Sequence, residues 1–178
     1  MVQKNGAVVG ISDHGGWAVF VTVSRDGAML DRRRVELVDD TLPAIPHHHE
    51  AQALPVDAGV ALVERVRESA EKHSALALDA VAAAVPGIGG IALRQCPRLP
   101  ATIAERLKDY RARNVADWVM YRNALAAAAQ ARGWFVHWYD PKTLNLEADA
   151  IALRKKLGPP WSADHRLAMA AAVDAASA

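Results

Sequence analysis

The chain has 178 residues, of which 21 are Lys or Arg and 20 are Asp or Glu. This length suits one domain with a real core, so we expect residues 1–178 to form a single domain. The nearly neutral balance excludes a strong overall attraction to nucleic acid, although a local basic face stays open. One cysteine, Cys96, excludes an internal disulfide framework, and no apolar run is long enough to span a bilayer. We therefore expect a cytoplasmic protein.

The first part of the chain predicts three strands in an antiparallel meander. Residues 7–12 form a short apolar run, which is typical of a buried strand. Residues 17–24 alternate and are rich in Val, Phe and Thr, which predicts a second strand. Asp26-Gly27 fits a hairpin turn, and a third strand follows over about 28–38.

The remainder predicts helices that alternate with strands. Residues 39–55 contain several prolines and predict a loop whose histidines, His47-His48-His49, are solvated or, alternatively, hold a metal. A strand over 77–85 is followed by a glycine-rich loop over 86–90. Asn114 is expected to cap a helix that stops at Gly133. This order predicts a mixed five-stranded sheet with helices on both faces. The predicted helices in this part of the chain cover residues 56–74, 101–110, 114–132, 144–157 and 163–176. The predicted strands cover residues 77–85 and 134–139.

Three segments, in this order, resemble parts of a known family. Residues 9–18 resemble a first strand of the pattern Gly-Ile-Asp-Pro-Gly and the start of a second strand. Residues 122–141 resemble a helix, a fifth strand and the turn into the next helix. Residues 152–170 resemble a Leu-Gly and Pro-Pro loop followed by an acidic last helix. Together they give the chain a resemblance to the ribonuclease H-like superfamily, and within it to the crossover-junction endodeoxyribonucleases, the Holliday-junction resolvases.

The resemblance implies an α/β fold and a metal-dependent endonuclease. In such enzymes carboxylates from the first strand, the fourth strand and the last helix hold Mg²⁺ or Mn²⁺, which activates water against a phosphodiester. The resemblance assigns Asp13 and Asp164 as metal ligands. It assigns the same two residues, together with His165, as catalytic residues. Ser12, however, stands where the pattern places the first acid. Because side chains alternate along a strand, this shift of one residue can turn Asp13 to the other face. The predicted fourth strand also ends without an acid.

The resemblance also implies branched or single-stranded nucleic acid as a partner, and it allows a homodimer. The alanine-rich stretch over 124–129 is expected either to form such an interface or to pack on the sheet. Phosphate binding needs several cations on one face. The predicted nucleic-acid contacts are Arg106, Lys108, Arg111 and Arg113 in one group, and Lys142, Lys155 and Lys156 in another.

Two functions stay open on these grounds. The first is a resolvase-type nuclease with an incomplete carboxylate cluster. The second is a catalytically degenerate ribonuclease H-like domain that binds a nucleic-acid or protein partner. The sugar-kinase and actin-like ATPase group also begins with a hairpin bearing Asp and glycines, but it needs two such domains around ATP. The positions of Asp13 and Asp164 in space distinguish the first two hypotheses.

Overall fold

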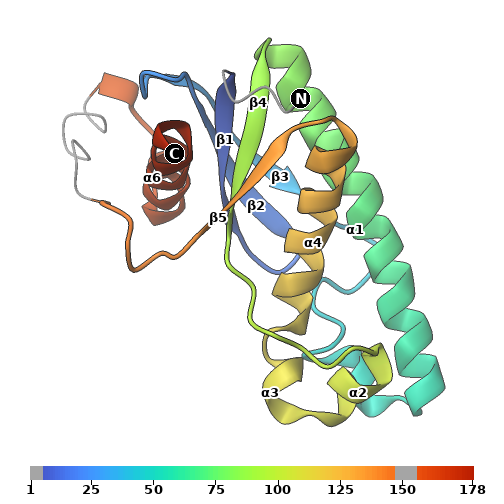
Figure 1. Ribbon diagram of the computed structural model, residues 1–178. Helices are drawn as coiled ribbons and strands as arrows, with labels where there is room; N and C mark the ends of the chain where they lie inside the picture. Colours follow the sequence, from blue (N-terminus) through green and yellow to red (C-terminus); the bar gives the residue numbers. More distant parts are fainter. Residues whose placement is uncertain (1–5, 147–155) are drawn as a thin grey trace.

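A mixed five-stranded sheet forms the centre of the molecule (Figure 1). The computed structural model describes residues 6–146 and 156–178. The strand order is β3-β2-β1-β4-β5, in which β1, β2 and β3 pair antiparallel and β4 and β5 run parallel to β1. The predicted fold class is confirmed. The strands are β1 (Ala7–Asp13), β2 (Trp17–Val23), β3 (Met29–Glu36), β4 (Ile88–Arg94) and β5 (Phe135–Tyr139).

Helices cover both faces of the sheet, as the sequence predicts. Figure 1 shows α6 on one side and the long helices α1 and α4 on the other. In the part of the chain that the structure describes, no helix combines the length and apolar character that a membrane span requires. The helices are α1 (Val56–Ala84), α2 (Ile103–Lys108), α3 (Tyr110–Arg113), α4 (Ala116–Ala131) and α6 (Ala163–Ser177), with a short 3-10 helix, η1 (Glu50–Ala53).

The fourth strand lies further along the chain than expected. Residues 77–85 do not form a strand, because they complete α1 and its C-terminal cap. Leu78 and Val81 are buried at helical spacing, and the alanines around them favour a helix. The glycine-rich segment predicted as a loop instead opens β4. A Cβ at Gly90 would lie 2.5 Å from the Phe135 ring, so a larger residue there would displace that ring.

The other elements begin and end close to their predicted positions, with two differences. Asn114 ends α3 rather than capping α4, which begins at Ala116. Most of the helix predicted over 144–157 lies outside the described residues, and residues 144–146 are not helical. Gly133 stops α4 with a φ of +73°, as expected.

Side chains of β1 are buried on both faces of the sheet, and their alternation assigns each to one side. Val9 and Ile11 pack in the core that α1 and α4 cover, whereas Val8 packs in the core that α6 covers. Gly10 also faces α6, because a Cβ at Gly10 would lie 1.8 Å from the carbonyl oxygen of Ala168. Even-numbered residues of β1 therefore face α6, and odd-numbered residues face α1 and α4.

Gly10→Ala is expected to lower the free energy of unfolding by about 3 kcal/mol, because α6 has to move away from the sheet. Gly87→Ala is the control, since Gly87 has a φ of +76° and open space around it. Backbone strain alone makes this second change cost about 1 kcal/mol. Urea denaturation followed by circular dichroism measures both. A loss at Gly10 no greater than that at Gly87 would contradict the close approach of α6.

Candidate functional site

Ser12, rather than Asp13, faces the last helix. The Ser12 hydroxyl donates to Asp164 Oδ1 at 2.9 Å. His14 Nε2 donates to the same oxygen at 2.7 Å. Asp164 lies in the first turn of α6, so these two hydrogen bonds join the start of that helix to the end of β1.

These contacts also set the charge of Asp164. Partial burial raises the pKa of its carboxyl, but the hydrogen bonds from His14 and Ser12 outweigh this effect and leave the pKa below its ordinary value. Asp164 is therefore an ionised carboxylate near neutral pH, with one oxygen already bonded to two side chains.

Asp13 points to the opposite face of the sheet, where it pairs with α4. Arg122 Nε donates to Asp13 Oδ2 at 2.8 Å, and the two side chains are only 8% and 1% exposed, respectively. Burial raises the pKa of Asp13, and Arg122 opposes that rise through its charge and its hydrogen bond. Arg122 also donates to the carbonyl of Gln95 at 3.2 Å, which ties α4 to the end of β4. Asp13 thus holds the fold together on the side away from Asp164.

The end of β4 supplies a cation on the side of Ser12 and Asp164. β4 runs parallel to β1 with Ala92 level with Gly10, and Ala92 packs in the core that α6 covers. Arg94 comes two residues later, so it belongs to the same face of the sheet. It is exposed, and its positive charge is one of the influences that lower the pKa of Asp13. The guanidinium of Arg94 therefore lies at the end of β4, where the resemblance implies a carboxylate.

This set of side chains does not fit the carboxylate cluster that the resemblance implies. Within residues 6–146 and 156–178, no three His, Cys, Asp or Glu side chains are grouped so that they could hold a metal ion. Mg²⁺ and Mn²⁺ prefer several oxygen ligands, carboxylates above all. Here the two predicted ligands lie on opposite faces of β1, and each already has its own partners, Arg122 for Asp13 and Ser12 with His14 for Asp164.

His165 and Arg32 fix the start of α6. The Ser162 N–H donates to His165 Nδ1 at 3.2 Å, and the Ser162 hydroxyl lies 2.8 Å from the same nitrogen. Burial lowers the pKa of His165, and the charge of Arg32 lowers it further. His165 is thus a neutral partner of the helix cap. Its predicted catalytic role stays a prediction.

Arg32 of β3 holds the loop that leads into α6. Its guanidinium donates to the carbonyls of Leu157 at 2.9 Å, Gly158 at 3.1 Å and Pro160 at 2.9 Å. Five N–H donors in a planar fork make arginine suited to several carbonyls at once. No local pattern in the sequence marks this role, because the partners lie more than a hundred residues away.

His47, the first residue of the histidine run, is buried rather than solvated. His47 is 1% exposed, and its Nδ1 donates to Asp117 Oδ1 at 2.7 Å. Asp117 is also fully buried, and it accepts the backbone N–H groups of His47 and His48. The expectation of solvent exposure is therefore wrong for His47, which the loop places against α4.

The predicted basic residues divide into structural and exposed ones. Arg106 donates to the carbonyls of Pro100 and Ala101. Arg113 donates to Gln52 Oε1 at 3.0 Å. These two arginines hold local structure. The exposed ones are Lys108, Arg111, Lys142 and Lys156, and Lys155 lies outside the described residues.

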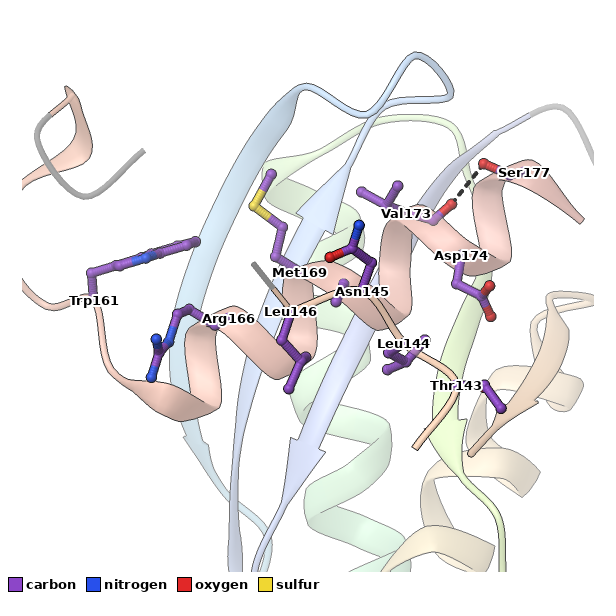
Figure 2. A pocket seen from close by; sticks show the side chains of 11 residues that line it. Thr143, Leu144, Asn145, Leu146, Trp161, Arg166, Met169, Val173, Asp174 and Ser177 are labelled. Carbon is purple, nitrogen blue, oxygen red and sulfur yellow. Dashed lines mark hydrogen bonds between the residues drawn. The ribbon is translucent and has the colours of Figure 1, made fainter. Parts of the chain in front are cut away.

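A hollow of about 380 Å³ lies beside α6, between that helix and the segment after β5. Figure 2 shows Leu144 and Leu146 of that segment beside Met169 and Val173 of α6. Arg166 is the one cation among the residues that line it. A polyanion needs several cations along its path, so this apolar hollow does not suit a phosphate backbone.

The pairing of Asp13 with Arg122 predicts a large effect of breaking it. Arg122→Met is expected to lower the free energy of unfolding by about 3–5 kcal/mol at pH 7, because it leaves a buried carboxylate without a partner. Adding Asp13→Asn in the same chain is expected to restore much of that loss. Urea denaturation of the two single variants and the double variant measures the coupling.

The loss in Arg122→Met is also expected to depend on pH. Without Arg122 the pKa of folded Asp13 rises further above that of the unfolded chain, which is about 3.9. The loss is then greatest above the folded pKa and shrinks as the pH falls through it toward about 4, because the folded state takes up the proton first. A loss below about 1 kcal/mol at pH 7, or one independent of pH, would contradict the buried ion pair.

Comparisons with known proteins bear on the fold. No model of a protein family matches the chain, and no curated protein matches it either. Among solved structures, the chain is similar to T. thermophilus RuvC in complex with Holliday junction substrate, with 16% sequence identity and a TM-score of 0.51. The match covers 94% of this chain and 90% of that chain. The chain therefore shares its fold with that structure, and the predicted α/β fold with a mixed five-stranded sheet is confirmed.

Proposed function

We propose that residues 1–178 act as one ribonuclease H-like domain that binds nucleic acid without cleaving it. One observation carries this proposal: Asp164 is bonded to Ser12 and His14, while Asp13 is paired with Arg122 behind the strand. Arg94, at the end of β4, stands where the family pattern has its second acid. A hydroxyl and a guanidinium replace the two acids that a metal would need. The same replacement makes the end of the sheet more attractive to a phosphate.

Arg94 is the residue that we expect to meet the phosphate backbone. A guanidinium binds phosphate oxygens through two parallel N–H groups, and Arg94 is exposed at the end of β4. It neutralises phosphate charge as a metal would, but it activates no water. Binding without hydrolysis is the expected result.

A stack of flat side chains next to Asp164, which His14 contacts, favours contact with unpaired bases. The rings of His14 and Trp17 are stacked with centroids 4.0 Å apart and planes 5° apart. The guanidinium carbon of Arg34 lies 3.8 Å from the centroid of the Trp17 ring. Aromatic and guanidinium faces of this kind stack on bases with little sequence preference. We therefore propose branched or single-stranded nucleic acid as the partner.

Dimerisation stays part of the proposal, on a surface other than the alanine-rich stretch of α4. Ala124, Ala126, Ala128 and Ala129 are buried in the core of this chain. The second of the two alternatives for that stretch, packing on the sheet side, is the one that the structure supports.

The competing proposal is a nuclease in which Asp13 and Asp164 hold Mg²⁺ or Mn²⁺ and His165 assists. It requires Asp13 to leave Arg122 and reach the other face of β1. His165 would also have to leave Ser162.

Binding and cleavage of a four-way DNA junction separate these proposals. Fluorescence anisotropy with EDTA is expected to show binding to the junction and to a single-stranded oligonucleotide. Arg94→Ala is expected to weaken both about tenfold and to reduce the dependence of log Kd on log salt by about one phosphate contact. The matched control is Arg65→Ala, an exposed arginine on α1, which is expected to leave the affinity unchanged.

The same junction is then incubated with Mn²⁺, and no cleavage is expected. Cleavage that Asp164→Asn abolishes would overturn the proposal and support the nuclease. Failure to bind any of these DNAs, with or without metal, would overturn nucleic-acid binding and leave a protein partner.

A further inference from the structure

A cavity of about 480 Å³ lies between α1, α2 and α4, on the opposite side of the sheet from α6. Val63, Ile103, Val119 and Met120 give it apolar walls. Its volume falls in the range of small-molecule sites, about 300–1,000 Å³. Nothing in the proposed binding of nucleic acid uses this cavity.

His47 forms part of the cavity wall and has one nitrogen without a partner. Its side chain is 1% exposed, and Nε2 is buried with no hydrogen-bond partner among the described residues. Buried polar atoms in folded proteins are almost always paired, so an unpaired imidazole nitrogen beside a cavity points to a partner that the protein chain does not supply.

The bond to Asp117 decides what that nitrogen can do. The Asp117 carboxylate accepts three N–H groups, from His47 Nδ1 and from the backbones of His47 and His48. A carboxylate in this setting only accepts, so the proton of the neutral imidazole is on Nδ1. In the neutral imidazole Nε2 is left with a lone pair, which accepts a hydrogen bond from a donor.

The charges around the cavity are already engaged. Arg67 donates to Glu64 at 2.6 Å and also to Glu71. Arg106 donates to the backbone carbonyls of Pro100 and Ala101. A charged ligand would find no free counter-charge in these arginines, so a neutral ligand fits best.

Cys96, which also lines the cavity, does not add covalent chemistry. Burial raises the pKa of the Cys96 thiol, which keeps it protonated and weakly nucleophilic. The site is therefore suited to reversible binding.

We propose that this cavity binds a small neutral molecule with an apolar body and one O–H or N–H group, which donates to His47 Nε2. The apolar walls take the body of the ligand. Asp117 keeps the imidazole in the tautomer that accepts.

Phenol is the probe ligand. Toluene is the control, because it has a similar shape but no hydrogen-bond donor. The full-length protein is labelled with ¹⁵N-histidine, and the His47 signals are identified by the slowly exchanging Nδ1 proton that Asp117 holds. Phenol is expected to shift the Nε2 resonance saturably, with a Kd of about 1 mM, whereas toluene leaves it unshifted.

A blocking variant tests the location without disturbing the core. Ala127 is exposed on α4 and lines the cavity, so Ala127→Trp is expected to abolish the phenol-dependent shift. Gln130→Trp, on the same helix but away from the cavity lining, is the matched control and is expected to behave as the unsubstituted protein.

Three results would each overturn the proposal. The first is no saturable shift up to about 10 mM phenol, which would mean that water alone occupies the site. The second is an equal shift with toluene, because binding would not then use Nε2. The third is a phenol shift that survives Ala127→Trp.

Discussion

The pleat of β1 separates Ser12 from Asp13 by the thickness of the sheet, and the chemistry of the site depends on that separation. Asp13 faces α4 and is held there by Arg122 at 2.8 Å. Ser12 faces α6 and donates to Asp164 at 2.9 Å. Both carboxylates are therefore fixed by partners, and the strand between them keeps them from sharing a metal ion.

The rest of the structure supports this arrangement from both sides. On one side, Gly10 and the small residues Ala168 and Ala172 let α6 lie close to β1. Arg32 donates hydrogen bonds to backbone carbonyls of the loop before α6. These contacts fix the start of α6 and with it the position of Asp164.

On the other side, Arg122 joins β1 to β4 by bonding both Asp13 and the carbonyl of Gln95. A buried ion pair of this kind is a strong constraint on position, because removing either charge leaves the other without compensation. Asp13, which a nuclease of this kind would use as a metal ligand, here connects β1 to α4 through Arg122.

The sequence was sufficient for the fold class and for part of the site. The meander, the β5 strand and the capped last helix follow from local patterns, and the one-residue shift of Asp13 already indicated that it could face away from the site. The fourth strand was misplaced because alanine-rich residues 77–84 extend α1, and with it Arg94 was missed. Had β4 been placed at residues 88–94, Arg94 would have been recognised at the position where the family pattern has an acid.

Other features depend on contacts that no local pattern reveals. His47 is buried because Asp117, which is 70 residues away, accepts its hydrogen bonds. Arg122 and Asp13 lie 109 residues apart in the chain. A single sequence carries no signal for such pairs, since each residue alone is typical of a polar surface.

Manganese-dependent line broadening in an amide NMR spectrum tests the central claim most directly, with Mg²⁺ as the diamagnetic reference. If Ser12 and Arg94 have replaced the metal ligands, then Mn²⁺ at about 0.1 mM broadens the amides of Ser12, Arg94 and Asp164 no more than those of the remaining surface. The double variant Ser12→Asp/Arg94→Glu is expected to gain selective broadening at these positions, which shows that the method detects such a site. Selective broadening of the same amides in the unsubstituted protein would contradict the account and restore the metal-dependent nuclease.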